Sequence, residues 1–305
     1  MTAARDRAVI RIGPAGWSYE DWAGIVYPDP KPRGFDALAY LSGYFDTVEV
    51  NSTFYRPAAR KMAESWARRV RGNKDFRFAV KLWRRFTHER DEAWAAADVE
   101  AARQALDPLH DAGRLGAVLA QFPWSFKRTD DSRAWLDDLT GAFDEFPLVV
   151  EVRHASWDTP EFFEGLAERG VGVVNVDQPL FGKSIKPSAR ATAPVGYVRL
   201  HGRNYEDWFR EGAGVEARYD YLYTAKELEP WAERTEAVAA KAGEVFVVTN
   251  NHFRGKAVAN ASMLRSMLED REVAAPPGVV AEYGDVLRGF AHPNGAHGVD
   301  GAGPA

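Results

Sequence analysis

The chain has 305 residues, a length that fits two average domains or one α/β barrel. Hydrophobic residues make up 46% and charged residues 27% of the sequence, which is typical of globular proteins and excludes a disordered, fibrous or coiled-coil chain. Lys and Arg total 39 and Asp and Glu total 44, so the net charge of −5 argues against a broadly basic surface for nucleic acid or membranes and leaves room for a local basic pocket.

Cysteine is absent, which rules out disulfides, thiolate nucleophiles and Cys-ligated zinc or iron–sulfur centres. The first residues, MTAARDRAVI, carry charges and no apolar segment, and no run approaches the ~18 apolar residues of a membrane span. We therefore expect a cytoplasmic protein that does not bind a membrane.

Short β-branched runs and helical patterns alternate along the chain. The runs predict eight strands, at Ala8 to Gly13, Thr47 to Val50, Arg77 to Lys81, Leu115 to Gln121, Leu148 to Arg153, Gly172 to Asp177, Gly196 to His201 and Val245 to Asn250. Seven helices are predicted, at Asp36 to Tyr44, Met62 to Val70, Glu92 to His110, Ser132 to Phe143, Pro160 to Arg169, Ala225 to Ala242 and Ala257 to Leu268. The sixth connection, Gln178 to Pro194, lacks a clear helical pattern.

This alternation predicts a parallel sheet. Eight units suit a closed (β/α)₈ TIM barrel better than an open doubly wound sheet, and the G-x-G-x-x-G fingerprint of the latter is absent. We predict one barrel domain over residues 1–270. The remaining residues, 271–305, are rich in Gly, Pro and Ala and are expected to form a flexible tail.

Charged and amide side chains gather where the predicted strands end, which is where (β/α)₈ enzymes build their active sites. Strand side chains alternate between the two faces, so the two members of each pair point the same way. With the outer face packed on helices, we expect all of these pairs to face the mouth of the barrel: Glu49/Asn51, Glu151/Arg153, Asn175/Asp177 and Arg199/His201. Aromatic residues such as Trp17 and Tyr55 follow the strand ends and would wall such a mouth.

Seven motifs carry a resemblance to a known family: IGPAGWSYEDWAGIVYP, FDTVEVNSTFYRP, FAVKLWRRFTH, LGAVLAQFPWSF, VVEVRHASW, YVRLHGR and FVVTNNHF. In content and order they resemble the YecE-like family, domain of unknown function number 72, over about Ile10 to Leu268. The resemblance implies a TIM barrel and a site location, and it supplies no reaction. It points to Asn51, Thr53, Phe54, Tyr55, Lys81, Glu151, Arg153, Asp177, Arg199, His201, Gly202, Arg203, Asn250 and Asn251.

The leading functional hypothesis is an enzyme that uses acid–base chemistry, as a hydrolase, lyase or isomerase, on a small phosphate- or carboxylate-bearing substrate such as a sugar or nucleotide. Carboxylates whose pKa values are pushed apart can serve as general acid and base, and arginine forks grip anions. The expected catalytic residues are Glu151, Asp177, His201 and Lys81. The expected substrate-binding residues are Trp17, Asn51, Tyr55, Arg153, Arg199, Arg203, Asn250 and Asn251.

Several alternatives stay open at this point. The polar residues could form a self-satisfied network of ion pairs, and His201 could be a hydrogen-bonded core residue. Lys81 could be a Schiff-base nucleophile, although we expect it to pair with Glu49 or Glu151 instead.

Two further alternatives concern ligands. We expect no cofactor, the alternative being a divalent metal held by Glu151, Asp177 and His201. The non-enzymatic alternative is a module that binds a nucleotide or single-stranded nucleic acid through arginines and stacked rings. The oligomeric state is left open.

Overall fold

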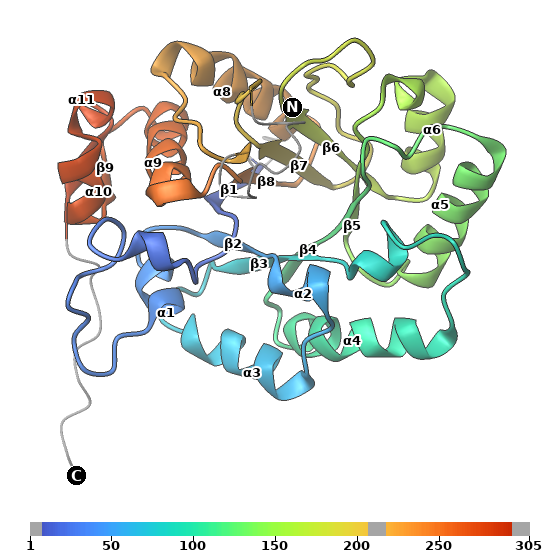
Figure 1. Cartoon of the computed structure of the whole chain (residues 1–305), viewed down its shortest axis with the longest axis horizontal. Coiled ribbons are helices and arrows are strands. Elements are labelled where there is room, and N and C mark those ends of the chain that lie inside the picture. The colour runs from blue at the N-terminus through green and yellow to red at the C-terminus, as the bar shows by residue number, and fades with distance from the viewer. Residues whose placement is uncertain (1–7, 207–217, 295–305) are drawn as a thin grey trace, which may run out of the picture.

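Eight parallel strands form the centre of the molecule, with helices around them (Figure 1). The computed structural model describes residues 8–206 and 218–294. The strands follow one another in the order β1-β8-β7-β6-β5-β4-β3-β2. Their bounds are β1 Val9–Pro14, β2 Thr47–Val50, β3 Arg77–Lys81, β4 Leu115–Gln121, β5 Leu148–Glu151, β6 Gly172–Asp177, β7 Val195–Leu200 and β8 Glu244–Thr249.

The helices begin where the sequence supplies caps. The Asp36 carboxylate accepts hydrogen bonds from the first backbone amides of α1, and Thr159 caps α6, whose first residue is Pro160. The helix bounds are α1 Ala37–Ser42, α2 Ser52–Tyr55, α3 Arg60–Arg69, α4 Ala96–Asp111, α5 Asp130–Ala142, α6 Pro160–Glu168, α8 Ala225–Ala239 and α9 Lys256–Glu269. The predicted (β/α)₈ barrel is confirmed, and the connection between β6 and β7 has no helix, as expected.

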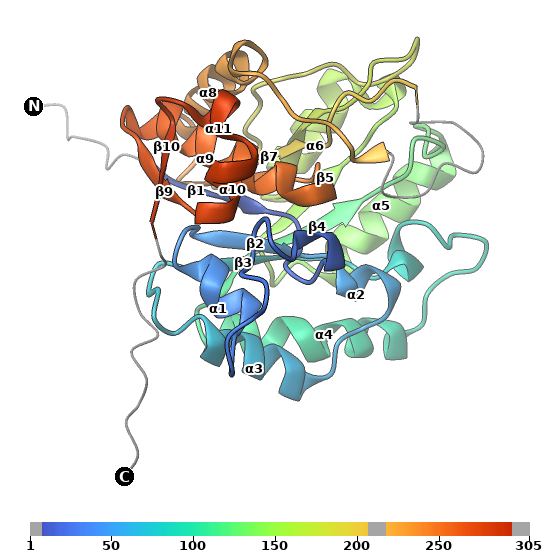
Figure 2. The same ribbon diagram turned by 60° about the vertical axis from the view of Figure 1, so that its left-hand side comes forward.

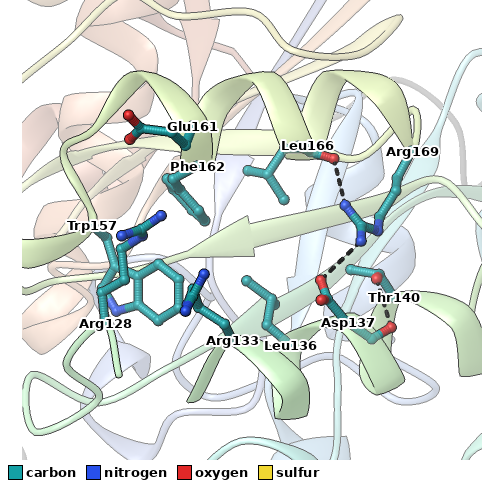
Figure 3. Close-up of a pocket in the computed structure, with 11 residues that line it drawn as sticks. Arg128, Arg133, Leu136, Asp137, Thr140, Trp157, Glu161, Phe162, Leu166 and Arg169 are labelled. Carbon is teal, nitrogen blue, oxygen red and sulfur yellow. Dashed lines mark hydrogen bonds and ion pairs between the residues drawn. The ribbon is translucent and has the colours of Figure 1, made fainter. Parts of the chain in front are cut away.

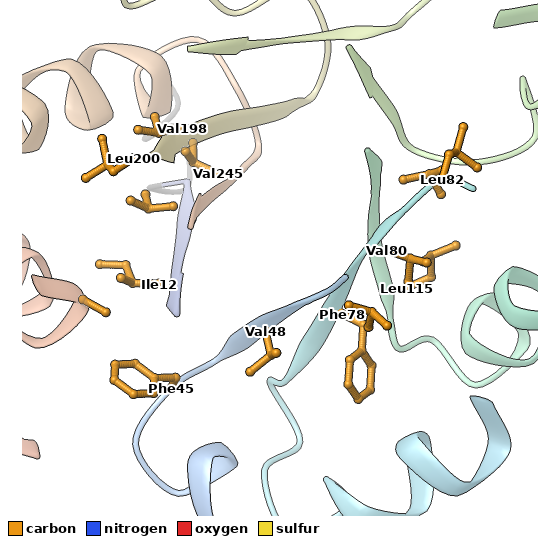
Figure 4. Packing of buried hydrophobic residues seen from close by; sticks show 14 of the residues in the cluster. Ile12, Phe45, Val48, Phe78, Val80, Leu82, Leu115, Val198, Leu200 and Val245 are labelled. Atoms are coloured by element: carbon orange, nitrogen blue, oxygen red, sulfur yellow. The ribbon is translucent and has the colours of Figure 1, made fainter. Parts of the chain in front are cut away.

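Hydrophobic side chains form two separate layers on the two faces of the strands. The outer layer fills the space between strands and helices, and Figure 4 shows Val48 and Phe78 there. The inner layer fills the lower part of the barrel and consists of Ala15, Ala79, Ala117, Leu119, Val149, Val174, Val176, Tyr197, Phe246 and Val248. This inner layer shows which positions of each strand point inward. Polar residues at the inward-facing positions near the carboxyl ends of the strands form the mouth.

Closure of the barrel depends on a glycine. β1 pairs with β8 along its full length, but it meets β2 through a single bridge, Ala15 to Glu49. A Cβ atom on Gly13 would lie 1.9 Å from the carbonyl oxygen of Thr47 in β2. The first strand can therefore approach the second only because residue 13 has no side chain.

The predicted flexible tail is wrong for residues 273–293. They form β9 Val273–Ala275, α10 Pro277–Glu282, α11 Gly284–Leu287 and β10 Ala291–Pro293, and β9 pairs with β10 in parallel. Figure 2 shows these elements beside α9. They are anchored by five buried side chains, Val273, Ala275, Val279, Leu287 and Ala291. Residues 295–305 of the predicted tail lie outside the described residues.

The abundance of Gly and Pro after residue 270 wrongly suggested a flexible tail, because several of these residues have structural roles. Pro277 occupies the first turn of α10, and Gly289 adopts a φ of 81° that L-residues rarely adopt. Gly278 packs directly against the backbone of Gly24 and Ile25. Within residues 8–206 and 218–294, no helix combines the length and apolar character needed to cross a membrane.

Gly13→Ala tests the closure of the barrel. The new methyl group would collide with the backbone of β2, so we expect the free energy of unfolding to fall by about 3 kcal/mol, the upper end of the usual cost of overpacking. Gly72→Ala is the matched control, because a Cβ atom on Gly72, in the turn after α3, would have open space within 4 Å. Denaturant unfolding measures both, and equal stability of the two variants would contradict the role assigned to Gly13.

Candidate functional site

One arginine holds two carboxylates together inside the mouth of the barrel. Arg199 at the end of β7 donates from Nη2 and Nε to Glu49 of β2, at 2.6 and 2.8 Å, and from Nη1 to Glu151 of β5 at 3.0 Å. The hydroxyl of Tyr197 donates to Glu49 at 2.8 Å. All four residues are buried, so this cluster ties three strands together across the barrel interior.

A second set of polar contacts extends the cluster toward solvent. Arg153 Nε donates to Glu151 Oε1 at 2.9 Å, and His201 Nε2 lies 3.2 Å from the same oxygen. On the other side of the imidazole, Asn250 Nδ2 lies 3.0 Å from His201 Nδ1. Nε2 also lies 3.2 Å from Arg153 Nη2 and 3.3 Å from Arg199 Nη1, and guanidinium and amide nitrogens can only donate, so the imidazole has donors on both sides.

The charge states of this cluster follow from burial and neighbours. Burial alone would raise the pKa of Glu151, but the charge of Arg199 and the contacts from His201 and Arg153 outweigh it and hold the pKa well below 4.5. Burial, followed by the charge of Arg153, lowers the pKa of His201 to about 3. At neutral pH the carboxylate is therefore ionised and the imidazole is neutral.

Lys81 is different, because its amine lacks an anionic partner. Within the part of the chain that the structure describes, no carboxylate lies within ion-pair distance of its Nζ, which lies 3.9 Å from the centroid of the Phe54 ring. Burial, followed by the charge of Arg199, lowers the pKa of Lys81 to about 7. The expected pairing of Lys81 with Glu49 or Glu151 is wrong, because both carboxylates pair with Arg199 and neither lies within ion-pair distance of the lysine.

Asp177 does not face the mouth, contrary to the sequence prediction. Val174 and Val176 belong to the inner hydrophobic layer, so Asn175 and Asp177 point outward. Asp177 accepts two hydrogen bonds from Arg203, at 2.9 and 3.0 Å. Alternation correctly placed Asn175 and Asp177 on the same face of β6. It could not show whether that face points inward or outward, because valines lie on both faces of the strand.

Two other predicted binding residues lie with Asp177 in the outer layer. Arg203 is held by Asp177 and also lies 3.6 Å from Glu227. Asn251 donates to the carbonyl of Tyr221 and to Asn260, which fixes the chain before α8 to α9. The metal set of Glu151, Asp177 and His201 is not assembled either, because its members lie on opposite faces of the barrel wall.

The remaining predicted residues surround the mouth. Asn51 directly follows β2, and its buried Oδ1 has no hydrogen-bond partner among the described residues. Tyr55 is 64% exposed on α2. Trp17 follows β1 and packs edge-on against Trp66, with ring centroids 5.7 Å apart, so it contributes to packing.

Glu49 and Tyr197 are central to the cluster, but neither was among the catalytic or binding residues expected from the sequence. Both could have been found from alternation, because Glu49 shares a face with Asn51, and Tyr197 shares one with Arg199 and His201. A tyrosine so far inside a strand is easily read as an ordinary core residue.

A separate pocket of about 220 Å³ opens on the outer wall, between α5 and α6 (Figure 3). Its floor is apolar, with Leu136, Phe162 and Leu166, and an ion pair of 3.0 Å between Arg169 and Asp137 lies at one end. None of the predicted site residues lines it.

Comparison with known proteins identifies the family. The family described as "Protein of unknown function DUF72" matches residues 11–281. The chain belongs to the DUF72 family. It is 30% identical over 275 residues to UPF0759 protein YunF of Bacillus subtilis. The aligned region covers 86% of this chain and 95% of that protein. The YecE-like resemblance in the sequence is thereby confirmed.

Solved structures of DUF72 proteins share this fold. One from Thermotoga maritima has a TM-score of 0.75 and 32% identity, covering 86% of this chain and 99% of its own. One from Enterococcus faecalis has a TM-score of 0.75 and 24% identity, covering 86% of this chain and 96% of its own.

The two-carboxylate cluster of this DUF72 chain predicts a large effect of Arg199→Met. The substitution leaves Glu49 and Glu151 without their shared counter-charge, and breaking a buried pair typically costs about 3–5 kcal/mol. Arg288→Met removes an exposed ion pair with Asp285 and should cost about 1 kcal/mol or less. Urea unfolding measures both, and a loss below 1 kcal/mol in Arg199→Met would show that the cluster does not stabilise the barrel.

The neutral imidazole of His201 predicts a loss of stability in acid. Its pKa is lower in the folded chain, about 3, than the 6.5 of an unperturbed histidine, so below pH 6.5 the unfolded chain binds the extra proton. One such group removes about 1.4 kcal/mol of stability per pH unit. Between about pH 6 and 5 the free energy of unfolding should therefore fall less in His201→Gln than in the parent, by about 1.4 kcal/mol.

His110→Gln is the control for this measurement, because His110 is exposed at the end of α4. Unfolding free energies at several pH values give the slopes. Parallel slopes for the parent and His201→Gln would mean that His201 is protonated in the folded protein.

Proposed function

We propose that this protein is an enzyme that acts by acid–base chemistry on a small anionic molecule bound at the carboxyl end of the barrel. The observation that carries the proposal is Lys81, an amine at the mouth with a pKa of about 7 and no carboxylate partner among the described residues. Such a group exchanges a proton readily at neutral pH, and burying a cation without an anion is costly unless a ligand supplies one.

The charges at the mouth favour an anionic ligand. Glu49 and Glu151 are balanced by Arg199 and Arg153, so a protonated Lys81 leaves a surplus positive charge. The two arginines differ in access, because the side chain of Arg153 is 14% exposed and that of Arg199 is 2% exposed. We therefore assign the anion-binding role to Arg153 and Lys81, and a structural role to Arg199.

Proton transfer would involve Lys81 and His201. Both can be neutral near pH 7, and the His201 ring is held by Asn250 at Nδ1 and by Glu151 and the two arginines at Nε2. Glu151 stays ionised and acts as a positioning residue for Arg153 and His201. Asn51, with an unpartnered amide oxygen, and Tyr55, on the rim, are the residues proposed to orient the substrate.

A thermal-shift screen with sugar phosphates, nucleotides, small carboxylates and a short oligonucleotide tests this function. A ligand at 100 times its dissociation constant stabilises the folded protein by about 2.7 kcal/mol, which raises the melting temperature by several degrees. We expect one class of small anion to give this shift in the parent and in Arg288→Gln, and to give none in Lys81→Met or Arg153→Gln.

Lys81→Met is the more informative variant, because removing an unpaired cation leaves no buried charge behind and the variant should fold. A shift that persists in both mouth variants would overturn the proposed site. Binding of the oligonucleotide alone, with an affinity that falls steeply with salt, would favour a nucleic-acid-binding module instead.

A further inference from the structure

The amine of Lys81 makes no ion pair with either buried glutamate, and other donors bind both of these carboxylates. Arg199 and Tyr197 occupy both oxygens of Glu49, and Arg199 also occupies Oε2 of Glu151. The remaining oxygen, Oε1 of Glu151, is held by Arg153 and His201. Each of the four carboxylate oxygens thus has a partner other than the lysine, although the lysine projects from an inward-facing position of β3.

The other groups around Lys81 also disfavour its protonated form. Burial is the largest cause of the lowered pKa of Lys81. The charges of Arg199 and Arg153 lower it further, whereas those of Glu49 and Glu151 raise it. Phe54 covers one side of the amine, and His88 packs edge-on against the same ring, with centroids 4.8 Å apart. Burial and the nearby cations lower the pKa of His88 to about 3, so it adds no negative charge.

We propose that the Lys81 Nζ is a nucleophile that forms an imine with the carbonyl carbon of an anionic aldehyde or ketone, a carboxylate or a phosphate ester. The inference rests on the proposed function and names its substrate class. An uncharged amine within a closed barrel, beside fixed cations, is the arrangement that activates lysine for carbonyl chemistry. Paired to a glutamate, the same amine would be held as an ammonium and could not attack.

The distance between the two cations indicates a small substrate. Lys81 ends β3 and Arg153 follows β5, so one strand, β4, separates them, which corresponds to about 10 Å between the strand axes. The charge of Arg153 acts across this gap and lowers the pKa of Lys81. A molecule of a few carbons could place its carbonyl group at Lys81 and its anionic group at Arg153.

The reaction balances without another reactant. The nitrogen lone pair attacks the carbonyl carbon, the C=O electron pair moves to oxygen, and a proton passes from nitrogen to that oxygen. The C–O bond then breaks, and the hydroxyl group leaves as water after it takes up a second proton. Starting from the ammonium form, the sum is ammonium plus carbonyl giving protonated imine plus water. The imine draws electrons from the neighbouring carbon, which eases loss of a proton or breakage of a carbon–carbon bond there.

Reductive trapping tests the inference on the full chain. The protein is incubated with pyruvate or dihydroxyacetone phosphate and sodium cyanoborohydride, with acetone as the neutral control probe. Intact mass spectrometry then seeks a gain equal to the probe minus one water plus two hydrogens, and peptide mapping locates it. We expect one adduct, on Lys81, formed at least about tenfold faster with an anionic probe than with acetone.

Lys81→Arg keeps the charge and should not form this adduct, whereas Lys127→Arg, which changes an exposed lysine at the same end of the barrel, should react like the parent. Mapping of the parent protein keeps the test valid if Lys81→Arg fails to fold. The rate should rise between about pH 6 and 8, the range in which Lys81 loses its proton.

Labelling spread over exposed lysines, or an adduct that survives in folded Lys81→Arg, would overturn the inference. The outcomes also separate the two proposals. A small anion that binds in the thermal-shift screen while no probe is trapped would overturn imine formation and leave the acid–base function standing. The absence of both binding and trapping would overturn both.

Discussion

The buried contact between Arg199 and two glutamates determines how the rest of the mouth is arranged. One guanidinium from β7 spans the barrel to β2 and β5, so three strands far apart in the sequence depend on a single side chain. A buried arginine and carboxylate must satisfy all their hydrogen-bonding groups, because each unpaired charge is expensive. In this arrangement neither carboxylate forms an ion pair with Lys81. The reactivity proposed for the lysine follows from this arrangement, because burial and the charge of Arg199 lower its pKa.

Most of the fold could be predicted from the sequence because its signals are local. The strand Gly172–Asp177 is a continuous run of small, β-branched and polar residues, and its predicted and observed limits coincide. The parity of that same strand could not be predicted, because which face turns inward is set by contacts with β5 and β7. The structure of residues 273–293 could not be predicted for a related reason. Their Gly and Pro residues resemble a flexible tail until the buried side chains between them are seen to pack on α9.

The candidate site was predicted as a set of residue types and only partly as a geometry. Alternation correctly brings Glu151, Arg153, Arg199 and His201 to one face, since every second residue of a strand shares a side. Their pairing could not be read from the sequence. Lys81, Arg153 and Arg199 could pair with Glu49 and Glu151 in several ways that have the same charge balance. The outcome depends on which side chains reach each other across the barrel. That is a property of strand register, which local patterns do not encode.

The first strand is hydrogen-bonded along its length to the last strand of the barrel and touches the second at one bridge. A nascent chain emerging from the ribosome therefore presents β1 with one edge open until nearly all of the barrel has been synthesised. Open strand edges invite pairing with other chains, and joining distant segments carries a large entropic cost. The barrel can close only after translation has passed residue 249, so the seam between β1 and β8 is where chaperone protection would matter most during biosynthesis.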